Sequence, residues 1–334
     1  MFDRLDKLNI RHTNNRRLMI GKGAEVDVLS DGSEFLIPGI CEHIEKASVH
    51  SGDSISAFPA VTLSDAVKEE IVEFTGRLVR ELGFKGLLNI QFVIYDNAVY
   101  VSSASVVATR NIPFLSKATA LPIIEFATRL MLGETLSDIG IGTGLYKEPQ
   151  KSFVRVPVFS FEQLTGTDVQ LGGEMQSTGE VIGVGRRFDE ALLKGFIASG
   201  MRIKRTGGVL ISVADSDKPA SAALAAAFQK LGFKVYATSN TAKLLNANHV
   251  AANAVRKIHE GSPNTLTLIL QNRLSYLAST AQQTAAKNAD EVRIRRTALV
   301  RRIPVLPSVE TAAALAARRA ENRSDGAICV ERLR

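Results

Sequence analysis

Short strand patterns dominate the first third of the chain. Two pairs of β-rich runs, each joined by a turn signal, predict hairpins over residues 24–37 and 87–103. Between them, apolar residues recur every three or four positions over residues 67–82, which predicts an amphipathic helix capped by Ser64 and closed by Gly83. A helix between antiparallel hairpins, without alternating strand–helix units, favours an α+β fold.

The patterns are weaker at the N-terminus and after residue 133. Residues 1–20 show no clear period, so we expect frayed or incomplete structure there. Residues 121–132 predict a second amphipathic helix, and residues 133–152 are rich in glycine and polar residues. A strand at 153–159 and a helix at 188–198 are then expected before the rhythm changes.

From residue 208 onward, strand patterns alternate with helical ones. The predicted strands are 209–213, 234–238, 276–280 and 304–306, and the predicted helices are 219–231, 241–246, 290–301 and 309–319. Such alternation predicts a parallel sheet covered by helices on both faces. The boundary between the two halves is expected at residues 200–208.

The amino-acid composition indicates which broad class of protein this is. The chain has 334 residues, 45% hydrophobic and 22% charged, which indicates two folded domains and excludes a disordered chain. No run of 18 residues lacks charge, and the N-terminus is polar, so neither a membrane span nor a signal peptide is expected. Cys41 and Cys329 stand far apart, which is typical of a reducing compartment, and we expect a cytoplasmic protein.

The net charge of +7 is concentrated near the C-terminus, where residues 291–334 hold ten arginines and five acids. A basic surface attracts phosphate-bearing partners, among them nucleic acid. Only 6% of residues are aromatic and none is tryptophan, so there are few stacking platforms for single strands. A solvated helix face is the commoner explanation, and a nucleic-acid partner is not expected.

Hydroxyl residues follow three of the predicted parallel strands, and two lysines lie near them in sequence. Carboxyl ends of parallel strands meet at one edge, beside the N-termini of the following helices. Hydroxyls, backbone N–H groups and lysines together suit a phosphate, although each Ser or Thr is also a common helix cap. The set is Ser212, Lys218, Thr238, Thr241, Lys257, Ser279 and Thr280. With no general base or nucleophile beside them, binding without catalysis is expected.

The first half has fewer signals. His43 and His50 stand seven residues apart, which is no established metal spacing, and hydrogen-bonded structural histidines are the commoner case. Gln91 lies in an apolar strand, where a buried amide needs hydrogen-bond partners, or a metal and phosphate, to satisfy it. These residues alone name no reaction.

Several longer strings resemble one family. They are LIPGICEHIEKASVHSGDSISAFPAVTLS, GLLNIQF, NIPFLSKATALP, MQSTGEVIGVGRRFDEAL and the ATSNTAK…KIHEG pair, and they resemble the C-terminal part of the carbamoyl phosphate synthetase large chain from about residue 20 to about residue 320. The resemblance implies a partial ATP-grasp module (the carbamoyl phosphate domain) over residues 1–135, its connecting segment over 136–200, and a methylglyoxal-synthase-like allosteric domain over 201–325. The implied fold is an α+β ATP-grasp half followed by an α/β parallel-sheet domain.

The resemblance also assigns candidate residues. Gln91 matches a glutamine that binds magnesium, and His50 and Arg110 match phosphate-contacting positions of the ATP site. Ser103 and Ser105 stand where the family has the metal-binding glutamate and asparagine, and a neutral hydroxyl is a poor ligand for a hard cation. The positions that match the family's effector-phosphate site are Lys218, Thr238, Thr241, Lys257, Ser279 and Thr280.

The resemblance begins after the first half of the ATP cleft. We therefore expect a truncated, catalytically inactive relative, from the pathway to pyrimidine and arginine precursors, that has lost Mg-ATP but keeps an effector site for UMP or IMP. Its expected partners are other synthetase chains and the nucleotide effector. The alternative is one chain of a split, active glutamine-dependent synthetase, an ATP-dependent ligase.

Overall fold

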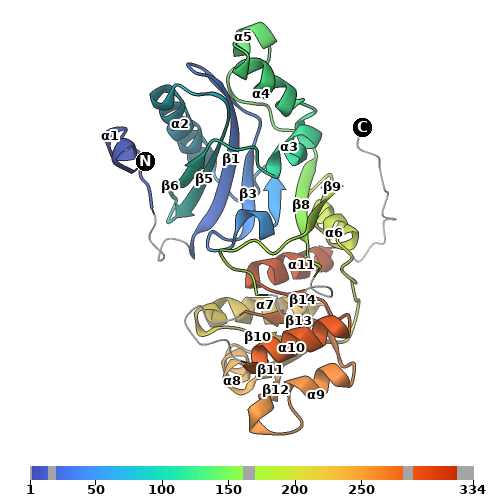
Figure 1. Cartoon of the computed structure of the whole chain (residues 1–334). Helices are drawn as coiled ribbons and strands as arrows, with labels where there is room; N and C mark the ends of the chain where they lie inside the picture. The colour runs from blue at the N-terminus through green and yellow to red at the C-terminus, as the bar shows by residue number, and fades with distance from the viewer. Residues whose placement is uncertain (1, 14–19, 161–169, 281–288, 322–334) are drawn as a thin grey trace. The chain divides into compact units, whose positions relative to one another are not determined.

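The computed structural model describes residues 2–13, 20–160, 170–280 and 289–321 (Figure 1). The chain divides into two compact units. The first unit comprises Met1–Pro157 and Val181–Gly195, and the second comprises Val158–Glu180 and Phe196–Ile328, apart from the residues outside the ranges above. None of the helices within those ranges is long and apolar enough to cross a membrane.

A mixed sheet forms the centre of the first unit, with strand order β6-β5-β1-β3-β4-β8-β9, while β2 pairs with β1 and β7. Its strands are β1 Lys22–Asp31, β2 Phe35–Ile37, β3 Ile40–Lys46, β4 Ser56–Phe58, β5 Lys85–Tyr95, β6 Ala98–Ser105, β7 Gly144–Leu145, β8 Ser152–Val158 and β9 Gly179–Gly185. The pairs from β6 through to β8 are antiparallel, which agrees with the expected α+β class.

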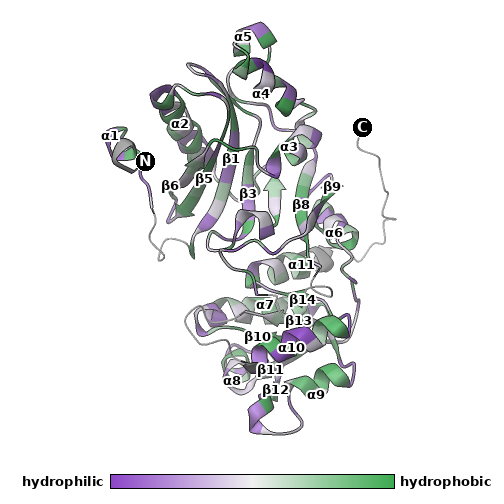
Figure 2. Ribbon diagram, viewed as in Figure 1, coloured by the Kyte–Doolittle hydropathy of each residue, from purple (hydrophilic) through white to green (hydrophobic). Residues whose placement is uncertain are grey.

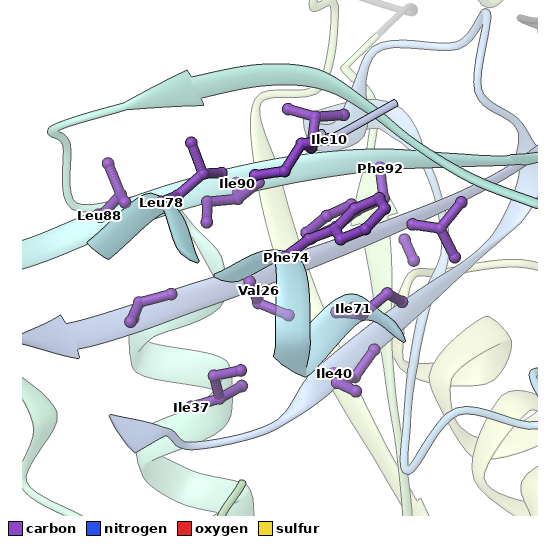
Figure 3. Packing of buried hydrophobic residues seen from close by; sticks show 14 of the residues in the cluster. Ile10, Val26, Ile37, Ile40, Ile71, Phe74, Leu78, Leu88, Ile90 and Phe92 are labelled. Carbon is purple, nitrogen blue, oxygen red and sulfur yellow. The ribbon is translucent and has the colours of Figure 1, made fainter. Parts of the chain in front are cut away.

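Helices cover both faces of this sheet. They are α1 Phe2–Lys7, α2 Asp65–Leu82, α3 Asn111–Thr119, α4 Ile123–Met131, α5 Leu136–Ile139 and α6 Phe188–Ala198. The apolar side of α2 packs on one face, where Ile71, Phe74 and Leu78 meet Val26 and Ile90 (Figure 3). Residues of α3 and α4 form a second core on the other face, with apolar residues from the strands.

The two predicted hairpins and the first predicted helix are confirmed. Ser64 caps α2 by accepting a hydrogen bond from the backbone N–H of Val67, and Gly83 ends it in the left-handed conformation. Asp96 and Asn97 both have positive φ, as a tight two-residue hairpin turn requires. Helix α3 and strands β3 and β4 were not predicted, because they are short and carry polar residues among the apolar ones.

The expectation of frayed structure at the N-terminus is wrong for residues 2–13. Residues Phe2–Lys7 form α1, and the side chains of Leu5 and Ile10 are buried in the core beside α2. The segment is too short for a period to emerge, since its structure comes from packing and not from its own repeat.

The second unit contains a parallel sheet of order β12-β11-β10-β13-β14, which confirms the α/β prediction. Its elements are β10 Gly208–Ser212, α7 Lys218–Lys230, β11 Lys234–Thr238, α8 Ser239–Ala247, β12 Ala252–Val255, α9 Thr265–Leu270, β13 Leu274–Ser279, α10 Ala289–Val300, β14 Val305–Leu306 and α11 Val309–Glu321. Strand β12 and helix α9 were not predicted, because each is too short to show a period. Figure 2 shows a hydrophobic α9 beside an α10 with a strongly hydrophilic stretch.

Candidate functional site

The carboxyl ends of four neighbouring strands meet at one edge of the parallel sheet. Ser212 at the end of β10 is in register with Ser279 at the end of β13, and Thr238 at the end of β11 is in register with Val255 at the end of β12. Lys257 follows two residues after Val255. The structure therefore brings most of the predicted phosphate-binding residues to one edge, where ligands of such sheets bind.

Thr238 and Thr241 frame the N-terminus of α8. Thr238 is the N-cap residue, yet its side chain makes no capping hydrogen bond, and its Oγ1 lies 3.5 Å from Oγ1 of the buried Thr241. The ordinary capping explanation therefore does not apply to Thr238. Backbone N–H groups in the first turn of a helix favour an anion, and these hydroxyls can donate to the same anion.

Lys218 begins α7 and already has an anionic partner, because its Nζ lies 2.5 Å from Oδ1 of Asp215. Thr280 is fixed to the loop after β10: its N–H donates to the carbonyl of Ser212 (3.1 Å), and its Oγ1 accepts from the N–H of Ala214 (2.9 Å). Thr280 therefore shapes this edge through its own hydrogen bonds.

Lys257 is exposed at the start of a short 3-10 turn, Ile258–Glu260. Its backbone N–H donates to Oε2 of Glu260 at 2.8 Å, and its exposed ammonium has no ion-pair partner among the described residues. In the same turn, His259 Nδ1 lies 3.0 Å from Oδ2 of Asp290, at the start of α10. This contact joins the segment that carries Lys257 to α10.

Sequence reasoning missed Arg295, a buried arginine of α10. Its Nη1 lies 3.5 Å from Oγ of Ser279 and 3.9 Å from Oε2 of Glu291. The helical period could have indicated that Arg295 is buried, since it lies on the inner side of α10 with the buried Ile294 and Ala298. Its guanidinium adds positive charge beneath the same edge of the sheet.

In the first unit, two rows of polar side chains run across one face of the sheet. The first row joins Ser103, Gln91 and Glu25, and the second joins Ser105, Asn89 and Asp27. Gln91 and the two serines, which sequence analysis placed at the metal site, are thus neighbours. The acids beside them, Glu25 and Asp27, were missed, although acids at alternate positions of an otherwise apolar strand are a readable signal.

The turn at His50 lies beside this face. Gln91 Nε2 donates to Oγ of Ser51 at 3.3 Å, and Nδ1 of His50 accepts from the N–H of Gly52 at 3.0 Å. Buried Arg155 donates from Nη2 to the carbonyl of Ser51 at 2.7 Å. The side-chain amide of Gln91 therefore has a hydrogen-bond partner in the turn that follows His50.

The two buried acids accept hydrogen bonds from the residues on either side of Arg110 in the sequence. Asn111 Nδ2 donates to Glu25, and Thr109 Oγ1 donates to Asp27 at 2.9 Å. Burial raises the pKa of Glu25, but the nearby His43, Arg155 and Ser51 together outweigh this and leave the pKa lowered. Burial and the charge of Glu25 raise the pKa of Asp27 to about 7, against the hydrogen bonds from Thr109 and Asn89.

The residues of this face do not fit a pair of magnesium ions. Ser103 and Ser105 are neutral, and the buried Glu25 and Asp27 already accept hydrogen bonds, Glu25 through Oε1 from Asn111 and Asp27 from Thr109. Among the residues that the structure describes, no three His, Cys, Asp or Glu side chains converge as a metal site would require.

Two protein-family models match the chain. Residues 15–139 match the family described as "Carbamoyl-phosphate synthase L chain, ATP binding domain", and residues 221–306 match the "MGS-like domain". The two rows of polar side chains lie within the first match. Thr238, Thr241, Lys257, Ser279 and Thr280 lie within the second match, whereas Ser212 and Lys218 precede it. Both parts of the resemblance inferred from the sequence are confirmed.

Curated relatives agree. The chain is 43% identical over 300 residues to the carbamoyl phosphate synthase large chain of Clostridium perfringens, covering 90% of this chain and 28% of the relative. It is 41% identical over 310 residues to that of Lachnoclostridium phytofermentans, covering 93% of this chain and 29% of the relative. The chain thus spans less than a third of the length of these relatives. Among solved structures, the biotin carboxylase domain of a single-chain bacterial carboxylase matches 55% of this chain and 46% of its own, at 17% identity and a TM-score of 0.42.

Proposed function

We propose that this chain, which resembles the C-terminal part of the carbamoyl phosphate synthetase large chain, binds a nucleoside monophosphate in its MGS-like domain and does not itself transfer phosphoryl groups. UMP or IMP is the proposed ligand, and the effector would act on carbamoyl phosphate synthesis by partner synthetase chains in the cytoplasm. The pathway would be the one that supplies pyrimidine and arginine precursors.

One observation carries the binding proposal: the N-terminus of α8 has no side-chain cap and faces the edge where neighbouring strands end. A phosphate there can accept from the first-turn N–H groups and from Thr238 and Thr241. Lys218 lies after β10 and Lys257 after β12, and Ser279 and Thr280 at the end of β13 are the remaining proposed phosphate-binding residues. A dianion matches this arrangement of donors and cations.

The ATP-grasp residues support the second part of the proposal. Phosphoryl transfer depends almost wholly on positioning and on neutralising charge with metal ions. The metal-binding carboxylate and amide are replaced by Ser103 and Ser105, while Gln91, His50 and Arg110 are kept. This set suits a remnant ATP site that lacks its magnesium.

The alternative function is one chain of a split, active synthetase. The observation that favours it is the register of Glu25 with Gln91 and of Asp27 with Asn89, which leaves carboxylates on the face where the metals would bind. In that case ATP turnover should appear when the other synthetase chains are added, and it should disappear in a Glu25→Gln variant that still folds.

Calorimetric titration with UMP and IMP tests the binding proposal. Lys257→Ala removes a charge-assisted contact, so affinity should fall roughly 10–150-fold, equivalent to about 1.5–3 kcal/mol. Thr241→Val should cost about 0.5–1.5 kcal/mol. Lys234→Ala is the matched control, because Lys234 begins β11 at the opposite edge of the sheet. Equal affinity for Lys257→Ala and wild type would show that the assigned site is wrong.

A further inference from the structure

The amino ends of the parallel strands meet at the edge of the sheet opposite the proposed nucleotide site. Gly208 at the start of β10 is in register with Lys234, which begins β11, and with Leu274, which begins β13. The backbone N–H of Lys234 donates to the carbonyl of Gly207 at 2.9 Å. Three neighbouring strands therefore begin at the same level, and we call this border of the sheet the amino edge.

The connections that lead into these strands carry positive charge and no acids. The helix-to-strand connections are residues 199–207, 231–233, 248–251, 271–273 and 301–304, and none of them contains Asp or Glu. The exposed cations in or directly beside them include Lys204, Arg205, Lys234, Arg273, Arg301 and Arg302. Because all of these connections end at one edge, the amino edge concentrates positive charge in a chain whose net charge is +7.

Stabilisation of helix ends explains only part of this charge. Arg301 and Arg302 directly follow α10, where the partial negative charge of a helix C-terminus favours cations. Lys204 and Lys234 belong to no helix, and their ammonium groups form no ion pair with the acids of the described residues. Like charges held close together repel each other, and a bound polyanion relieves this repulsion.

The other side chains at this edge narrow the class of polyanion. Leu270 and Val300, the last residues of α9 and α10, are 47% and 79% exposed, and aliphatic side chains add nothing to binding a phosphate backbone. The aromatic residues Phe233, Tyr236 and Tyr276 are buried, which leaves none of them as a platform for stacked bases. A lipid surface would need a longer apolar face than two aliphatic side chains. Cations beside exposed aliphatic side chains suit an acidic protein segment.

We propose that the amino edge is a docking surface for an acidic segment of a partner protein, in which Asp or Glu side chains alternate with apolar ones. Arginine binds carboxylates through two parallel hydrogen bonds. Arg273 is held in place for this, because its Nη2 donates to Oη of Tyr236 at 3.3 Å and its guanidinium lies 5.7 Å from the ring centre. Leu270 and Val300 contact the apolar side chains of the partner. Five strands span about 19 Å, which about six residues of an extended segment cover.

The test measures binding of a labelled peptide of alternating Glu and Leu, about twelve residues long, to the full chain by fluorescence anisotropy at about 50 mM salt. Wild type should bind the peptide, and about 500 mM salt should weaken the binding. The double variant Lys204→Glu, Lys234→Glu should bind at least about tenfold more weakly. The control is Lys85→Glu, Lys117→Glu, which makes the same change in net charge at exposed lysines of the first unit and should bind as wild type does.

Equal affinity of wild type and the amino-edge variant, an equal loss in the control, or no wild-type binding at millimolar peptide would each overturn the proposal. Tighter binding of a DNA duplex, or of vesicles of anionic phospholipid, than of the peptide would also overturn it, because the edge would then serve another class of partner. If circular dichroism shows that the variant has unfolded, the milder Lys204→Gln, Lys234→Gln should show the loss of affinity, and wild-type affinity would contradict the proposal. The titration contains no nucleotide, so its result is independent of UMP or IMP binding.

Discussion

Replacing Asp27 with asparagine should change stability in a way that depends on pH. Asp27 is 1% exposed and lies two residues from Glu25 on the same face of β1. Its pKa is raised to about 7 from 3.8 by burial and by the charge of Glu25. At a pH between these two values, the carboxyl of Asp27 therefore keeps a proton in the folded state that it has released in the unfolded chain.

The sign follows from this difference in bound protons. Between pH 3.8 and about 7 the folded state binds more protons at Asp27 than the unfolded state, so the free energy of unfolding falls as pH rises. Each pKa unit is worth about 1.4 kcal/mol, so the full loss above pH 7 is about 4 kcal/mol. Asparagine keeps the shape, accepts from Thr109 and carries no charge, so the variant escapes this loss.

The assay is urea unfolding at about pH 5 and about pH 8, read by pulsed hydrogen exchange of β1 and β5 peptides so that only this sheet is reported. The variant should gain about 3 kcal/mol on wild type between the two pH values. Glu25→Gln is the contrasting variant: His43, Arg155 and Ser51 together lower the pKa of Glu25 against its burial, so removing its charge should destabilise the sheet at the higher pH. A stability difference between Asp27→Asn and wild type that is the same at both pH values would refute the reasoning.

Three further predictions concern other contacts. Asp215→Asn should tighten UMP or IMP binding severalfold by calorimetry, because the carboxylate 2.5 Å from Lys218 competes with the ligand phosphate, and weaker binding would contradict this competition. In a titration with Mn²⁺ followed by electron paramagnetic resonance, wild type should bind the ion weakly, and the double variant Ser103→Glu, Ser105→Asn should bind it measurably tighter. Tight binding by wild type would contradict the proposed loss of the metal site. Gly183→Ala should lower the melting temperature by several degrees, since its Cβ would lie 1.9 Å from the carbonyl oxygen of Ala191, and an unchanged melting temperature would show that β9 and α6 can move apart.

Local signals predicted most of the fold. Helix α2 has a period, a cap and a terminating glycine, and the alternation after residue 208 fixed the parallel sheet, so these elements needed no knowledge of the rest of the chain. The expectation of frayed structure was wrong for residues 2–13 because Leu5 and Ile10 pack against residues of α2 and β5, which lie far away in sequence. Arg295, Glu25 and Asp27 were missed for a related reason: their partners come from other elements, and only the register brings them together.

Hydrogen exchange with and without UMP or IMP tests the central claim most directly, because it reports where the nucleotide binds as well as whether it binds. Protection should increase in the first turn of α8 and in residues 256–260, at the carboxyl edge of the parallel sheet, and it should stay unchanged at Lys234 on the opposite edge. Inorganic phosphate at high concentration should compete with the nucleotide for the same amides. No added protection at saturating nucleotide, or protection confined to other segments, would contradict the proposed binding site.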